Sequence, residues 1–172
     1  KVLRLTDLRM VNSTWTSNHI ESICRQKPCL VFPPCDVSHL TKFKGEREKG
    51  LIISIGQFRP EKRIPMQLEI MKELKDQGCN ARLIIMGGCR NDGDWKIYRD
   101  AETFIEENSL NVTLEANVSS EHLYEMLAKA DLGIHTMYNE HFGICVVEYL
   151  ASGVIPVANK SAGPLMDIVQ DE

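Results

Sequence analysis

The sequence predicts an α/β fold, a Rossmann-like, doubly wound parallel sheet, on two observations. Short apolar runs rich in β-branched residues alternate with stretches of helical length along most of the chain. The connections between these segments are short, and repeated strand–helix–strand units form a parallel sheet with helices on both faces, because their crossovers are almost always right-handed. In such sheets ligands bind beyond the carboxyl ends of the strands. We therefore expect the functional site in the loops that follow the strands.

Each predicted element has its own local signal. Strands are apolar runs that stop at glycine, proline or polar residues, and helices begin at a proline or a serine cap and end before glycine. In chain order, the predicted elements are helix Ser17–Gln26, strand Cys29–Phe32, strand Leu51–Ile55, helix Pro65–Leu74, strand Arg82–Met86, helix Trp95–Glu107, strand Val112–Leu114, a helix capped by Ser119 or Ser120, strand Leu132–His135, helix Gly143–Ala151 and strand Val154–Ala158. The loops at the strand ends are then Gly56–Arg63, Gly87–Asn91, Asn117–Ser120 and Thr136–Gly143.

Length and composition limit the class of protein. The chain has 172 residues with 20 Lys+Arg against 24 Asp+Glu, a formal net charge of -4, which fits one domain at about 150 residues per domain. We therefore expect a single domain over residues 1–172 and no nucleic-acid partner. No apolar run reaches the roughly 18 residues of a membrane span, so this stretch is expected to be soluble. The chain opens without Met and closes in a predicted helix at Asp167–Glu172, so we expect a piece of a longer protein.

The six cysteines indicate free thiols. They are scattered, with no C-x-x-C pair and no regular spacing. A structural zinc site needs closely spaced pairs of ligands. We therefore expect reduced cysteines in a protein that faces the cytosol, and no metal.

The loop Gly56–Arg63 carries three cations within seven positions of a strand-ending glycine. Arg59 can fork onto phosphate oxygens, and Lys62 can act as a point charge beside a helix N-terminus, which also favours an anion. A diphosphate clamp is one interpretation of this pattern. A solvated turn, with Glu61 balancing one cation, is the other, and this loop alone does not decide between them.

The loop Thr136–Gly143 also joins a strand to a helix, and it adds two carboxylates. Gly143 lets the backbone approach a ligand at the helix N-terminus. Glu140 lies in this loop, and Glu148 falls in the second turn of the following helix. Carboxylates beside an anion site favour a ligand that carries both phosphate and hydroxyl groups, such as a nucleotide sugar. The alternatives are a Glu140 favoured only by the helix dipole and a Glu148 that is merely exposed.

These motifs together resemble a known family. The segment Glu140–Gly143, the Glu148 that follows, Ala151-x-Gly153 and the small residues of Ser161–Pro164 resemble the signature of two glutamates separated by seven residues in retaining glycosyltransferases with the GT-B fold. Within that family, the chain is similar to the eukaryotic GDP-mannose-dependent α-1,2-mannosyltransferases of dolichol-linked oligosaccharide synthesis. The motifs that carry this similarity are Val11–Thr16, Pro33–Asp36, Gln57–Lys62, Gly87–Asn91 and His135–Ile144.

The resemblance implies the C-terminal, donor-binding domain of a GT-B enzyme with GDP-mannose as donor. Lys62, with Arg59, would neutralise the diphosphate that departs. Backbone N–H groups of Phe142, Gly143 and Ile144 would bind it from the helix end.

The resemblance also implies contacts for the rest of the donor. Glu140 would contact the mannose, Glu148 the ribose hydroxyls, and Val118 the guanine edge through its backbone. The strand-ending glycines complete the implied donor site: Gly56, Gly87 and Gly88.

The sequence departs from the family pattern at three points. Gln57 stands where most members have Arg, Ala162-Gly163 where Gly-Gly is usual, and Asp167 where Glu is common. The first departure implies that Arg59 reaches the phosphate from a different backbone position or that the clamp is weaker.

The remaining expectations concern the acceptor, the metal and the place of action. The resemblance implies a dolichol-linked oligosaccharide acceptor bound mainly by a domain before Lys1, the cytosolic face of the endoplasmic reticulum membrane, and possible complexes with other mannosyltransferases of the pathway. We expect transfer without a metal or other cofactor, with Arg59 and Lys62 taking the place of the ion, and the resemblance implies retention. The alternatives are a sister hexosyltransferase using a UDP-sugar and a non-catalytic nucleotide-sugar-binding module. A nicotinamide dehydrogenase lacks support because no G-x-G-x-x-G opens the first strand–helix turn.

Overall fold

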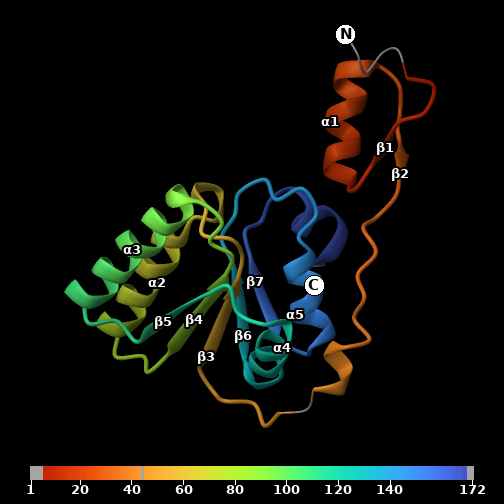
Figure 1. Ribbon diagram of the computed structural model, residues 1–172. Helices are drawn as coiled ribbons and strands as arrows, with labels where there is room; N and C mark the ends of the chain where they lie inside the picture. Colours follow the sequence, from red (N-terminus) through yellow and green to blue (C-terminus); the bar gives the residue numbers. More distant parts are fainter. Residues whose placement is uncertain (1–5, 44, 170–172) are drawn as a thin grey trace.

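The main feature of the computed structural model, which describes residues 6–43 and 45–169, is a five-stranded parallel sheet (Figure 1). Its strands lie in the order β5-β4-β3-β6-β7, so the chain builds outward from β3 in one direction and then from β6 in the other. The strands are β3 (Leu51–Ile55), β4 (Arg82–Gly87), β5 (Val112–Ala116), β6 (Leu132–His135) and β7 (Ile155–Ala158). The predicted doubly wound parallel sheet is confirmed.

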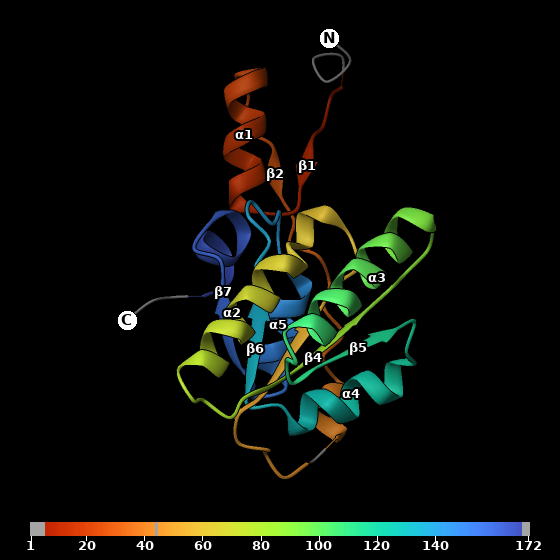
Figure 2. The same ribbon diagram turned by 90° about the vertical axis from the view of Figure 1, so that its left-hand side faces the viewer.

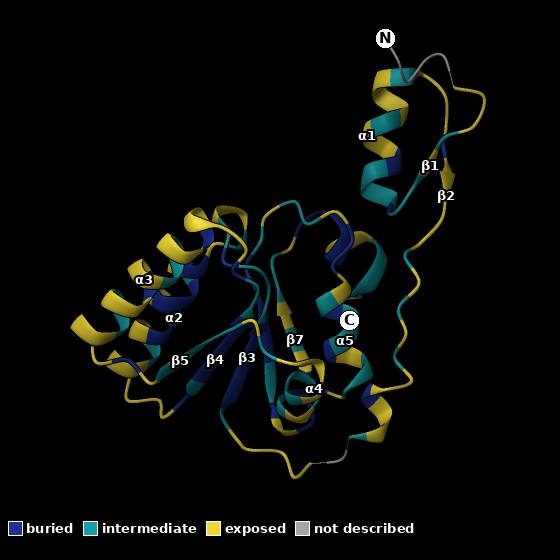
Figure 3. Ribbon diagram, in the orientation of Figure 1, coloured by how far each residue is buried: buried dark blue, intermediate teal, exposed yellow. Residues whose placement is uncertain are grey.

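Helices cover both faces of this sheet (Figures 1 and 2). Helices α2 (Ile64–Asp76) and α3 (Asp92–Glu107) pack on one face, where they share a hydrophobic core with alternate residues of β3 and β4. Helices α4 (Ser120–Lys129) and α5 (Ile144–Ala151) pack on the other face. The central strands are buried, whereas β7 at the edge alternates exposed and half-buried residues (Figure 3).

Several element boundaries differ from the prediction for local reasons. Helix α3 begins at Asp92 and not near Trp95, because the side chain of Asn91 accepts a hydrogen bond from Asp94 N at 2.9 Å and caps the helix. Strand β5 runs two residues beyond the predicted end, because Glu115 and Ala116 continue the ladder with β4. Strand β7 begins at Ile155, one residue later than predicted.

Residues 10–30 form a separate strand–helix–strand unit, which stands apart from the main sheet in Figure 1. Strands β1 (Met10–Val11) and β2 (Cys29–Leu30) pair in parallel, and helix α1 (Thr14–Cys24) connects them. Helix α1 begins before the predicted Ser17, because the side chain of Ser13 accepts from Thr16 N at 3.1 Å. The predicted strand to Phe32 is shorter than expected.

The unit touches the main domain through α1 and the segment after β2. The backbone N–H of Thr14 donates to Asp167 Oδ2 at 2.9 Å, so Asp167 helps to cap α1. Trp15 stacks on His141 with ring centroids 5.4 Å apart. Asp167 lies in a helical turn, η4 (Pro164–Ile168), and a short 3-10 turn, η2 (Leu40–Lys42), precedes the main sheet. Residues 1–5 and 170–172, on which the expectations about the chain ends rest, lie outside the described residues.

Strands β3 and β6 mark the point where the strand order reverses, and Tyr149 bridges them there. Their ladder pairs Ile52 with Leu132 and Ile53 with Gly133. The buried Tyr149 hydroxyl accepts from Ile55 N at 2.9 Å and donates to Ile134 O at 3.3 Å. A Cβ atom on Gly133 would come within 2.6 Å of the Tyr149 ring, so glycine provides the room for it. Open α/β sheets bind ligands at this point of reversal, beyond the carboxyl ends of the strands.

We expect Tyr149→Phe to lower the free energy of unfolding by about 1–3 kcal/mol, because it leaves the Ile55 N–H and the Ile134 carbonyl without this partner. Urea unfolding followed by circular dichroism measures the change. Tyr138→Phe is the matched control, since Tyr138 is 62% exposed. Equal stability of the Tyr149→Phe variant and the wild type would contradict the bridging role.

Two further structural facts bear on the expectations from composition. No helix among the described residues is both long and apolar enough to cross a bilayer. All six cysteines, each of them described, are free thiols.

Candidate functional site

Two adjoining cavities lie at the carboxyl ends of the strands, one of about 370 Å³ and one of about 360 Å³. Both are lined by Ile55, Gly56 and Gln57 at the end of β3. The first cavity extends toward the start of α5, and the second toward the ends of β4 and β5. All four loops predicted from the sequence contribute residues that line these cavities.

Lys62 and Glu140 meet in the first cavity. The Nζ atom of Lys62 lies 2.8 Å from Glu140 Oε2, and both side chains are largely buried, with 17% and 16% of their surfaces exposed. Nζ also lies 3.4 Å from Met137 Sδ. An ammonium group has three donors, so a third remains for a ligand in the cavity. The sequence analysis treated these residues as parts of two separate loops, and the fold joins them.

The carboxylate of Glu140 is held in its ionised form. The His135 ring and the Lys62 ammonium lower the pKa of Glu140 to about 2, outweighing the opposite effect of burial. His135 Nε2 lies 3.3 Å from Glu140 Oε2, although the geometry falls short of a full hydrogen bond. The backbone N–H of His141 donates to Glu140 Oε1 at 3.0 Å. Glu140 is therefore a fixed negative charge beside a fixed positive one.

The backbone around Lys62 is fixed by the end of β3 and by Thr136. Gly56 carries no side chain, and a Cβ atom there would lie 3.3 Å from Lys62 Cδ, so the lysine stem packs over it. Thr136 Oγ1 donates to Lys62 O at 2.8 Å and accepts from Gln67 Nε2 at 2.9 Å. This buried network holds the start of α2 against the end of β6.

The start of α5 faces the same cavity. Gly143 adopts a φ of 100°, in the left-handed region that favours glycine, and precedes the first helical residue. Within the described residues, the backbone N–H groups of Phe142, Gly143 and Ile144 donate to no protein acceptor. Such groups at a helix N-terminus favour an anion.

Glu148 lies in the second turn of α5, as predicted, and lines the first cavity. Burial raises its pKa above the usual value for glutamate. It is therefore not a merely exposed helix residue. Glu140 and Glu148 share one cavity but have pKa values shifted in opposite directions, a pattern typical of functional sites.

Glycines are prominent in the lining of the second cavity. Gly87, Gly88, Asn117 and Val118 line it together with Arg90. Asn117 adopts a φ of 56°, and its Oδ1 accepts from the backbone N–H of Cys89 at 3.0 Å. A Cβ atom on Gly87 would lie 1.8 Å from Gly56 O, so this glycine permits the two strand ends to meet, whereas a Cβ atom on Gly88 would make only ordinary contacts at 3.9 Å.

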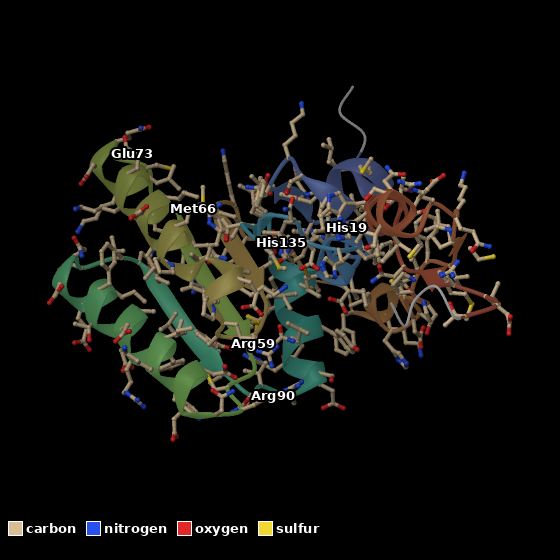
Figure 4. The ribbon with its side chains drawn as sticks, turned by 90° about the horizontal axis from the view of Figure 1, so that it is seen from above. His19, Arg59, Met66, Glu73, Arg90 and His135 are labelled. Carbon is tan, nitrogen blue, oxygen red and sulfur yellow. The ribbon has the colours of Figure 1, made fainter. Side chains whose placement is uncertain are left out.

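The side chain of Arg59 lines neither of these cavities. Its Nε atom is 4.0 Å from Asp94 Oδ1 at the start of α3. Asp94 also accepts from Arg90 N at 2.9 Å, and Figure 4 shows Arg59 near Arg90 and apart from His135. The structure therefore brings one of the two predicted clamp cations, Lys62, into the cavity, and the role of Arg59 stays a prediction.

The segment Ser161–Pro164 supports the site from behind. Ser161 Oγ accepts from Asn139 N at 3.0 Å, and Gly163 N donates to Glu140 O at 2.9 Å. A Cβ atom on Gly163 would lie 2.4 Å from His141 O. The small residues that the sequence placed after the last strand therefore serve packing, and they hold the loop that carries Glu140.

Sequence reasoning missed several residues of the site. His135 adjoins Glu140, and Cys145 lies beside His135. The other residues without a predicted role line the cavities: Asn12, Pro33, Gln57, Arg90 and Cys145. Asn12 and Pro33 lie in segments that carry the family resemblance, but only the fold brings them to the cavity. The described residues hold no cluster of three His, Cys, Asp or Glu side chains suited to a metal ion.

The domain is of the parallel α/β class that binds ligands at its switch point, and a cation, a helix N-terminus and carboxylates meet there. The model of the family described as "Glycosyl transferases group 1" matches residues 38–172, and the chain belongs to this family. The fold also matches solved structures. The Anabaena HepE protein in complex with UDP-glucose superposes with a TM-score of 0.79 at 17% identity, covering 96% of this chain and 48% of that one.

Two curated relatives narrow the comparison. The GDP-Man:Man(3)GlcNAc(2)-PP-Dol alpha-1,2-mannosyltransferase of Xenopus laevis is 41% identical over 175 residues, covering 95% of this chain and 36% of that protein. The protein of the same name from Dictyostelium discoideum is 42% identical over 183 residues, covering 96% of this chain and 36% of that protein. The chain thus spans about a third of the length of these relatives.

Proposed function

We propose that this chain is the donor-binding part of a GDP-mannose-dependent α-1,2-mannosyltransferase that acts on a dolichol-linked oligosaccharide. The observation that carries the proposal is the Lys62–Glu140 pair, 2.8 Å apart at the switch point of the sheet and beside the free N–H groups of α5. This arrangement offers a cation to a diphosphate and a fixed carboxylate to the hydroxyls of a sugar. The names of the relatives supply the donor and the acceptor.

We place the donor across both cavities. In the proposed complex, the guanine lies in the second cavity against Gly88 and Val118, and Glu148 accepts from the ribose hydroxyls. The diphosphate faces Lys62 and the N–H groups of Phe142 to Ile144, and the mannose lies near Glu140. Negative charge that develops on the departing GDP would then meet groups already fixed in place, which is where an enzyme gains most of its rate.

The proposal extends to the setting of the reaction. Transfer would proceed with retention, on the cytosolic face of the endoplasmic reticulum membrane, with the acceptor bound mainly outside this chain and in possible complexes with other mannosyltransferases. Glu148 is occupied by ribose in this scheme. The two carboxylates of a double displacement are therefore not both available, and departure and attack on one face of the sugar is the favoured path.

Calorimetric titration of this chain with GDP, UDP and ADP tests the proposed donor. We expect saturable binding of GDP and weaker binding of the other two. Equal or stronger binding of UDP would favour a sister hexosyltransferase that uses a UDP-sugar. An absence of binding to all three nucleotides would contradict the proposed function and favour a non-catalytic module.

We also expect the interaction with GDP to need no divalent metal, because Lys62 and the helix N-terminus supply the positive field. Titration of GDP in EDTA and in excess Mg²⁺ measures this directly. Affinities that agree within about twofold are the expected result. A tenfold gain with Mg²⁺, equivalent to about 1.4 kcal/mol, would assign the diphosphate to a metal.

A further inference from the structure

We propose that Cys145 and His135 form a positioning pair that fixes the orientation of Glu140. The Sγ atom of Cys145 lies 3.3 Å from His135 Nδ1, and His135 Nε2 lies 3.3 Å from Glu140 Oε2. The three side chains come from α5, the end of β6 and the loop between them. The buried His135 ring lies between the Cys145 thiol and the Glu140 carboxylate, and both of these residues line the first cavity.

The thiol of Cys145 is the donor in this pair. Burial raises the pKa of Cys145 to about 12, so its proton stays on the sulfur at neutral pH. A thiol is a weak donor, and a neutral imidazole offers one acceptor nitrogen. Donation from Sγ to Nδ1 therefore leaves the imidazole proton on Nε2, where it points toward Glu140.

The Glu140 carboxylate beside His135 favours a proton on Nε2 over one on Nδ1. The His135 side chain is 3% exposed. With the proton on Nδ1, the Nε2 lone pair would face a carboxylate oxygen at 3.3 Å, which is repulsive. The charged groups that face this pair are Glu140, Lys62, whose Nζ lies 2.8 Å from the same Glu140 oxygen, and Glu148 on the same helix as Cys145.

The burial of His135 Nε2 also restrains the rotation of the Glu140 side chain. Within the described residues, Nε2 has no full hydrogen-bond partner and is shielded from water. A buried donor without a partner is costly, and the nearest acceptor is Glu140 Oε2. Any rotation of Glu140 away from the ring therefore carries an added cost, and the carboxylate is held toward the cavity.

The role in donor recognition rests on the proposed function, but the protonation of His135 does not. Long-range ¹H–¹⁵N NMR spectra of this chain reveal which nitrogen of each histidine carries the proton. The His135→Gln variant identifies the signal among the five histidines. We expect the proton on Nε2, with Nδ1 free to accept from the Cys145 thiol. An Nδ1–H form or a doubly protonated ring would overturn the proposal without any variant of Cys145.

Two variants of Cys145 test the donor. Cys145→Ser keeps a donor and should keep the Nε2–H form, whereas Cys145→Val is similar in size, has no donor and should give a mixture of both forms. A wild-type spectrum from Cys145→Val would overturn the role of the thiol. Cys145→Ser also serves as the conservative variant if valine disturbs the fold.

Affinities for GDP and GDP-mannose then test the effect on Glu140. We expect Cys145→Val to lower the preference for GDP-mannose over GDP by about 2- to 10-fold, the size of one neutral hydrogen bond, and Cys145→Ser to restore it. An unchanged preference would overturn the positioning role. If the wild type binds neither compound, the proposed function fails, while the NMR result still decides the protonation of His135.

Discussion

Replacing Lys62 with methionine should weaken GDP binding by about 10- to 100-fold, because it removes a charge-assisted contact worth about 1.5–3 kcal/mol. Methionine keeps the aliphatic stem that packs over Gly56 and removes only the charge. The loss has a second part. Without Lys62, the buried carboxylate of Glu140 would face the diphosphate with no cation between them. Calorimetry with GDP measures the combined effect.

Two further substitutions show whether the loss is specific to Lys62. Lys72→Met removes an exposed cation from helix α2, which begins just after Lys62, and should leave GDP affinity unchanged. Arg59→Met tests the second cation of the predicted clamp, and we expect a smaller loss than for Lys62, because Arg59 faces Asp94. An equal loss would mean that the loop rearranges on binding and brings Arg59 to the phosphates. Unchanged affinity of the Lys62→Met variant would refute the clamp itself.

The sequence was sufficient to predict the sheet, because local signals and topology agree in this fold. Strand Leu51–Ile55 is a continuous apolar run, as a strand buried on both faces must be, and β4 repeats the pattern. Right-handed crossovers then left few ways to order the strands. The four site loops followed from the same rule, since they lie where parallel strands end.

The contacts within the site could not be predicted, because they depend on distances across the fold. Nothing local indicates that Lys62 and Glu140, 78 positions apart, share a hydrogen bond, or that Tyr149 bridges two strands with its hydroxyl. Arg59 shows that neighbours in the sequence need not meet in the site. Its place beside Lys62 in the sequence suggested a shared role, but the 3-10 turn Pro60–Lys62 separates the two side chains. The N-terminal unit was also missed as a separate sheet, because its strands are only two residues long.

Replacing Glu140 with glutamine should remove the preference for GDP-mannose over GDP while leaving GDP binding unchanged or stronger. The reason is the pairing with Lys62: a neutral amide no longer competes with the diphosphate for the ammonium group. A carboxylate that meets the sugar should contribute about 1.5–3 kcal/mol to GDP-mannose alone. Calorimetry with both compounds separates the two effects. An equal loss of affinity for GDP and GDP-mannose would remove Glu140 from the sugar subsite.

The same variant should change how stability depends on pH. The pKa of Glu140 is about 2 in the folded chain and about 4.3 in an unfolded one. A carboxyl group with a lowered pKa stabilises the fold above the unfolded value, and that contribution is lost as the pH falls through the folded value. The melting temperature of the wild type should therefore fall toward that of Glu140→Gln between about pH 4.5 and 2. Glu125→Gln, at an exposed position on α4, is the matched control. A constant difference between wild type and Glu140→Gln across this range would mean that Lys62 and His135 do not hold Glu140 as the fixed charge on which the proposed sugar contact depends.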